Sequence, residues 1–189
     1  MENKTILDAL HFIFELFRSK DKMLKDLIDN LQINDVKEGR KFELTKERIK
    51  NKILLSPVSF KDPKIKRHHT EEKWVDPYLN PLWGTRKVTI VEVEFPFVGS
   101  PELFEFRPDS VYVSDPTVYL PTGNLITVEV ETEILDKANV MNLAQKNLAL
   151  TISIINSLNG QIEDWSKRME STIDETIDKK RKELIEFYG

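Results

Sequence analysis

The sequence contains no cysteine, which excludes disulfide scaffolds, thiolate metal sites and cysteine nucleophiles. The lack of disulfides is compatible with a reducing compartment. No apolar run approaches the roughly 18 residues that a membrane span needs, and acidic residues interrupt the N-terminal apolar segment in a way that is unlike a signal peptide. We therefore expect a cytoplasmic protein that is not inserted in a membrane.

Glycine and histidine are also scarce. The six glycines are scattered, so there is no glycine-rich phosphate loop, and the three histidines offer no convincing Ser–His–acid triad. His68, His69, Glu71 and Glu72 form the one cluster of histidines and acids. Adjacent histidines on an extended chain point apart, and no distant third ligand is evident. We expect no metal and no cofactor, and we favour a protein without catalytic activity.

Charge is abundant but unevenly distributed along the chain. Residues 37–67 contain eleven Lys/Arg and four Asp/Glu, whereas residues 88–136 contain one Lys/Arg and ten Asp/Glu. Such asymmetry is found on nucleic-acid-binding surfaces. It also arises when the two segments face each other within the fold, or simply keep the surface soluble, and we favour these interpretations.

The N-terminal part of the chain has the apolar spacing of helices. Apolar residues at steps of three and four predict a helix over 3–19, and Asp21 is placed to cap a second helix over 22–31. In the basic stretch, Thr45 is placed to cap a short helix over 46–55, although the same residues are compatible with a basic strand.

The middle of the chain alternates between apolar and polar residues, which is typical of half-buried strands. Prolines and Gly84 predict a long loop over 61–87, and a Pro-Thr-Gly-Asn sequence predicts a turn at 121–124. Strands are expected at 88–97, 102–107, 111–113 and 125–134. In the last of these, Ile126, Val128, Val130 and Ile134 share the inward face.

Residues 136–188 have the helix period almost throughout, with Asp136 as the N-cap. Asn159-Gly160 is a common helix exit, which is compatible with a hairpin of two helices. A helix that continues through Gly160 is the other interpretation, at a cost of about 1 kcal/mol relative to alanine. We expect one α+β domain over 1–189, with a small antiparallel sheet packed against N-terminal helices and this long C-terminal region.

The leading functional hypothesis is a non-enzymatic interaction, oligomerisation or regulatory domain. A helix with so long an apolar stripe needs a partner surface, and the chain itself, a second copy or an attached effector can supply it. The residues expected to mediate association are Trp165, Met169, Ile173, Ile177 and Leu184.

Nucleic-acid binding through residues 37–67 is the first alternative. Basic side chains hold phosphates and an aromatic ring stacks on a base. The residues suited to these roles are Lys61, Lys64, Lys66, Arg67 and Trp74.

A degenerate nuclease is the second alternative. Pro108-Asp109 followed by Glu129-Val130-Glu131 resembles the catalytic motif of PD-(D/E)xK nucleases, in which carboxylates hold a divalent cation. Glu131 stands where that family has lysine, so the resemblance implies a metal site without its usual lysine.

A further resemblance concerns the order of segments. A hairpin containing Phe104-Glu105-Phe106-Arg107-Pro108-Asp109-Ser110 precedes a Pro121-centred turn, a Glu129-rich strand and the pattern Asn156-x-x-Asn159-x-x-Ile162-x-x-Trp165, and the chain ends after Lys180-Arg181-Lys182. This order resembles accessory domains that precede effector modules in bacterial anti-phage defence proteins. The resemblance implies a regulatory domain, and an end at Phe187-Tyr188-Gly189 is compatible with one domain of a longer protein.

Overall fold

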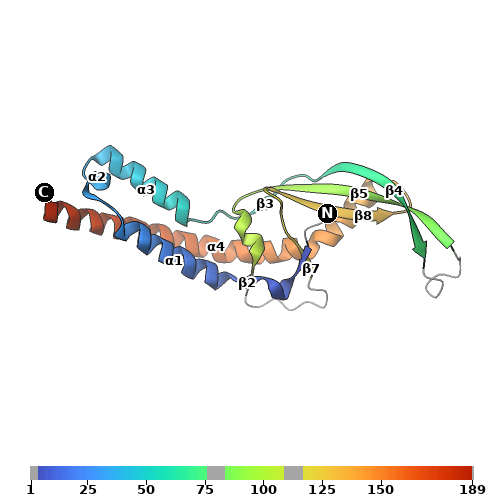
Figure 1. The fold of residues 1–189 in the computed structure, drawn as a ribbon, viewed down its shortest axis with the longest axis horizontal. Coiled ribbons are helices and arrows are strands. Elements are labelled where there is room, and N and C mark those ends of the chain that lie inside the picture. Colours follow the sequence, from blue (N-terminus) through green and yellow to red (C-terminus); the bar gives the residue numbers. More distant parts are fainter. Residues whose placement is uncertain (1–3, 76–83, 109–116, 189) are drawn as a thin grey trace.

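The computed structural model describes residues 4–75, 84–108 and 117–188, and Figure 1 shows them as an elongated molecule. Its axis is one helix, α4, which runs without interruption from Lys137 to Tyr188. At 1.5 Å per residue, its 52 residues span about 78 Å. Three helices lie on its second part and form the helical half, and a sheet lies on its first part and forms the sheet half.

A single apolar stripe along α4 serves both halves. Its members recur at steps of three and four, and all are buried in one continuous core. They are Val140, Ala144, Leu148, Ile155, Leu158, Ile162, Trp165, Met169, Ile173 and Ile177, and the buried polar residue Thr151 occupies the position between Leu148 and Ile155. Asp136 caps the helix as expected, because its Oδ2 accepts a hydrogen bond from the Asn139 amide at 2.7 Å. The hairpin interpretation is wrong, since α4 continues through Gly160.

The helical half consists of α1 (Ile13–Asp29), α2 (Ile33–Val36) and α3 (Gly39–Ile53). The expected break at Asp21 is absent, because α1 passes through it and buries Leu16, Leu24 and Ile28 on one face. The helix expected at 46–55 begins earlier, at Gly39, and Thr45 is a buried residue inside it and not its cap.

The helix expected over 3–19 is confirmed only from Ile13, where α1 begins, because the chain before α1 contains no α-helix in its described part. Residues 4–12 form β1 (Lys4–Ile6), the 3-10 turn η1 (Leu7–Ala9) and β2 (His11–Phe12). β1 pairs antiparallel with β7 (Thr117–Tyr119), and β2 pairs parallel with β6 (Phe106–Arg107). Tertiary pairing thus overrides an apolar spacing that also fits a helix. The strand expected at 102–107 is mostly the 3-10 helix η2 (Pro101–Glu105).

The sheet contains β3 (Ser59–Phe60), β4 (Lys64–Val75), β5 (Gly84–Val98) and β8 (Leu125–Thr132). β5 is central: it pairs antiparallel with β3 and β4 on one side and with β8 on the other. Most of the loop expected over 61–87 is therefore strand. Its prolines at positions 77 and 81 lie outside the described residues, as does the short strand expected at 111–113.

The period-two alternation of β5 and β8 is confirmed. Val91, Val93 and Phe95 lie opposite Val130, Val128 and Ile126, and all six are buried towards α4. The turn at 121–124 is present, with Gly123 at φ 61°. Ile134 is an exception: β8 ends at Thr132, and Ile134 is 72% exposed in the turn that leads to α4. The α+β class is confirmed, and the N-terminal helices lie on the second part of α4.

The two halves are joined at a waist, residues 54–58, where the chain crosses α4 between α3 and β3. The Asn159 side chain accepts a hydrogen bond from the Val58 amide and donates one to the Val58 carbonyl, both at 2.8 Å. Ser166 Oγ donates to the Leu55 carbonyl at 3.2 Å. These contacts hold the chain against the helix, and they explain why Asn159 does not end it.

Candidate interaction surfaces

Charged side chains cover the outer face of the sheet, the face turned away from α4. Lys66 Nζ lies 2.9 Å from Glu94, and Arg67 Nε donates to Glu92 at 2.6 Å. Lys73 reaches across β5 to Glu131 of β8. The basic strand and the acidic strands therefore neutralise each other, so part of the charge asymmetry of the sequence is resolved inside the fold.

Glu92 has the most unusual environment of these acids. It is only 5% exposed, although it alternates with the core-facing residues of β5. The hydrogen bond from Arg67 holds the pKa of Glu92 below its ordinary value, against the opposing effect of burial, and the positive charges of Arg67 and Lys66 act in the same direction. Glu129 lies directly opposite Glu92 on β8, and Arg67 relieves the repulsion between the two carboxylates.

This pairing bears on the proposed nucleic-acid surface. Lys66 and Arg67 already contact acids, whereas Lys61 and Lys64 are exposed and contribute positive charge nearby. Trp74 belongs to β4, opposite Thr85, and its side chain lies outside the described part of the chain. The structure thus places Lys64, Lys66 and Arg67 on β4 and Lys61 in the segment just before it, and two of the four face carboxylates.

Of the acids in the nuclease hypothesis, Asp109 lies outside the described residues, whereas Glu129 and Glu131 are on β8. Glu129 is beside the Arg67–Glu92 pair and Glu131 bonds to Lys73. His68 and His69 are consecutive on β4 and so lie on opposite faces of the sheet, and His69 Nε2 lies 2.9 Å from Glu71 Oε1. Within 4–75, 84–108 and 117–188, no three His, Asp or Glu side chains are grouped to hold a metal ion.

The five apolar residues expected to mediate association lie inside the chain. Trp165, Met169, Ile173 and Ile177 are buried, and Leu184 is half-buried against the same core. The Trp165 ring stacks on Phe17 of α1, with centroids 4.9 Å apart and planes 7° from parallel. The partner surface that this stripe requires is therefore supplied by α1, α3 and the sheet of the same chain.

Met169 also contributes to a groove between α1 and α4, with a volume of about 490 Å³. Leu24 and Ile28 supply the rest of its apolar floor. On the α4 side, Thr172 and Thr176 donate their hydroxyl hydrogen bonds to the carbonyls one turn earlier, at 3.0 and 2.6 Å. This wall of the groove is thus already satisfied in its hydrogen bonding.

The opposite seam, between α3 and α4, is charged. Lys50 Nζ lies 3.0 Å from both Glu170 and Asp174, and Lys46 lies 3.1 Å from Asp174. Burial raises the pKa of Asp174, but hydrogen bonds from Lys50 and Lys46 outweigh it and leave the pKa lowered. The same hydrogen bond raises the pKa of Lys50. These residues fasten α3 to α4.

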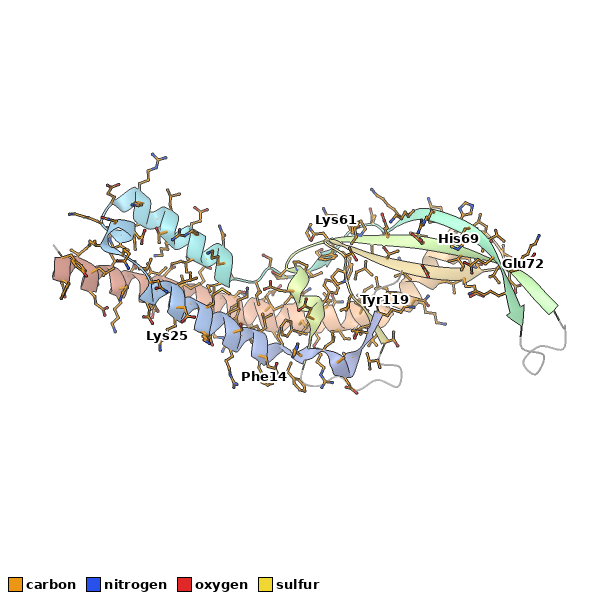
Figure 2. The ribbon with its side chains drawn as sticks, viewed as in Figure 1. Phe14, Lys25, Lys61, His69, Glu72 and Tyr119 are labelled. Atoms are coloured by element: carbon orange, nitrogen blue, oxygen red, sulfur yellow. The ribbon has the colours of Figure 1, made fainter. Side chains whose placement is uncertain are left out.

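The outer edge of β4 is open. β5 is the one strand paired with β4 in the described chain, and every residue from Lys64 to Glu72 is exposed. Figure 2 shows His69 and Glu72 on this part of the sheet, with Lys61 near its start. Sequence reasoning missed this edge, because the charged residues and the following prolines resembled a loop.

Comparison with known proteins yields no relatives: no family model, no curated protein and no solved structure matches this chain. Of the described helices, none is long and apolar enough to cross a membrane. The resemblance to accessory domains of defence proteins stays a prediction.

Proposed function

We propose that this protein is a non-enzymatic association module that binds a second copy of itself and serves a regulatory role. The observation that carries the proposal is the open edge of β4. This strand has twelve residues and is paired along one side only, in the part of the chain that the structure describes. Unpaired N–H and C=O groups on such an edge form a ready template for another strand.

Two further features support association over chemistry. The groups with lowered carboxyl pKa values, Glu92 and Asp174, sit in ion pairs that tie strands and helices together. Exposed apolar residues also remain at both ends of α4: Leu135 just before its start, and Phe187 and Tyr188 in its last turn. Such residues are suited to contacts with other chains.

Nucleic-acid binding is the weaker proposal, because acids on β5 and β8 neutralise much of the positive charge of β4. The regulatory part of our proposal, including a place in anti-phage defence, rests on the resemblance in segment order. Binding of the purified chain to nucleic acid at low and high salt tests this alternative separately from self-association, because nucleic-acid affinity falls steeply with salt.

The test is the mass of the full chain in solution, measured by light scattering and sedimentation over a wide concentration range. We expect a reversible increase from 22.1 kDa towards twice that mass. A mass that stays at the monomer value up to millimolar concentration contradicts the proposal. Truncation before Gln161 is unsuitable as a control, because it removes Ile162, Ile173 and Ile177 from the core of the chain itself.

A further inference from the structure

We infer that two copies associate by antiparallel pairing of their β4 strands, with His69 on the two-fold axis and Arg67 opposite Glu71 of the second copy. This inference deepens the proposed function and rests on it. It joins the two sheets into one continuous sheet across the axis.

The charges of β4 are sorted along the strand. Its first part contains Lys64, Lys66 and Arg67, and the acids Glu71 and Glu72 follow on the other side of His69. An antiparallel copy centred on His69 places each Arg67 directly opposite a Glu71, and Thr70 opposite His68. The two-fold axis generates the Arg67–Glu71 pair twice, and opposite charges in directly facing positions stabilise a strand pair.

Other arrangements of the same strand bring like charges together. Parallel pairing in register places Arg67 beside Arg67 and Glu71 beside Glu71. Moving the antiparallel axis by two residues, to Arg67 or to Glu71, sets that residue against itself. Like charges in facing positions destabilise a strand pair. An edge guarded by lysines alone would repel every copy, whereas this edge has both signs of charge, and the antiparallel alignment centred on His69 sets Arg67 against Glu71 on both sides of the axis.

The intramolecular contacts of these residues are compatible with the pairing. Arg67, His69 and Glu71 alternate along β4, so they share one face of the sheet. The guanidinium of Arg67 uses Nε and Nη2 on Glu92, which leaves Nη1 to face a carboxylate of the second copy. Glu71 uses Oε1 with His69, which leaves Oε2. The bulge between Ile65 and Arg67 limits the regular register to residues 67–71.

Single-cysteine variants test the register directly, because the chain has no other thiol. The axis places the two His69 residues directly opposite, with Cα atoms about 5 Å apart, a distance that a disulfide spans. The two Glu71 residues are offset by four positions, roughly 14 Å along the strand. On mild oxidation, His69→Cys is expected to form a disulfide-linked dimer at least about tenfold faster than Glu71→Cys.

Charge reversal provides a second measurement. Glu71→Lys opposes both copies of Arg67 and is expected to weaken dimerisation about tenfold or more, whereas Glu163→Lys, the same change at an exposed position of α4, leaves it unchanged. Circular dichroism and thermal unfolding check that each variant is folded. If the wild type dimerises but Glu71→Cys links as fast as His69→Cys, or Glu71→Lys dimerises like the wild type, the inference is overturned and self-association stands. If the wild type is monomeric throughout, the proposed function fails as well.

Discussion

The side-chain amide of Asn159 binds both backbone polar groups of Val58, accepting from its N–H and donating to its C=O at 2.8 Å each. This contact joins the middle of α4 to the waist. It mimics the pairing of a neighbouring strand, with a side chain in place of a second backbone. An asparagine before glycine is usually taken as a helix end, and here it is a cross-link from inside a helix.

Asn159→Ala is expected to lower the free energy of unfolding by about 2 kcal/mol, because two partly buried hydrogen bonds are lost at about 1 kcal/mol each. Urea denaturation measures the change. Asn156→Ala is the matched control on an exposed position of the same helix, and it should leave the stability within about 0.5 kcal/mol. Equal effects of the two substitutions would mean that the cross-link contributes nothing to stability.

Gly99→Ala is expected to destabilise the fold by about 3 kcal/mol or more. Gly99 has φ 111°, and an added Cβ would lie 2.2 Å from the Pro57 carbonyl oxygen, in the waist. Gly39→Ala is the control, because a Cβ there meets no atom within 4 Å. Thermal unfolding compares the two variants with the wild type. A Gly99→Ala protein as stable as the Gly39→Ala protein would contradict this close approach.

Gly160→Ala is expected to stabilise the protein, by up to about 1 kcal/mol. Gly160 lies inside α4 with no atom within 4 Å of an added Cβ, so alanine gains helix propensity without a clash. Gly123→Ala has equal space but φ 61°, and should cost about 1 kcal/mol. The contrast is measured by urea denaturation. A loss of stability in Gly160→Ala would indicate that α4 is broken at this point in solution.

The stability of the protein is expected to fall in acid. A carboxyl whose pKa is lower in the folded state stabilises the fold above its unfolded pKa, near 4.3 for glutamate, and this contribution is lost as the pH falls through the folded pKa. Glu92 and Asp174 both have lowered pKa values in the folded state. Arg67 donates a hydrogen bond to Glu92, and Lys50 and Lys46 donate hydrogen bonds to Asp174. The free energy of unfolding should therefore decrease below about pH 4.5.

Glu92→Gln isolates the contribution of one carboxyl to this acid dependence. The variant should show a shallower loss of stability between about pH 5 and pH 2 than the wild type. Glu163→Gln, at an exposed position, should follow the wild-type curve. Parallel curves for wild type and Glu92→Gln would show that the Arg67–Glu92 pair has no effect on the titration of the folded state.

The sequence predicts those elements of the fold that bury one face and whose apolar residues recur with a regular spacing. Apolar and polar residues alternate in sequence from Val91 to Phe95 of β5 and from Ile126 to Val130 of β8 because one side of each strand meets the core. The apolar stripe of α4 can likewise be recognised in the sequence from Val140 to Ile177. The remaining errors have tertiary causes. Residues 4–12 have helical spacing but pair with β6 and β7, whose positions no local pattern specifies.

The sequence predicts the basic residues of the β4 surface but neither their strand nor their acidic partners. The sequence identifies Lys64, Lys66 and Arg67 as a basic cluster but predicts a loop for their strand, since an edge strand lacks the buried apolar side that marks β5. The acids that neutralise them lie 25 or more positions away and become neighbours only through strand pairing. The association residues of α4 could not be told from core residues, because either role requires the same stripe.

The single apolar stripe of α4 also determines how cooperatively the protein unfolds. A helix that rotated about its axis to release the sheet would turn Ile173 and Ile177 out of the helical half at the same time. Despite its elongated outline, the molecule should therefore melt as one thermodynamic unit, with a calorimetric enthalpy equal to the van't Hoff enthalpy. Mechanical load applied at one end would travel the length of the helix without an intervening hinge.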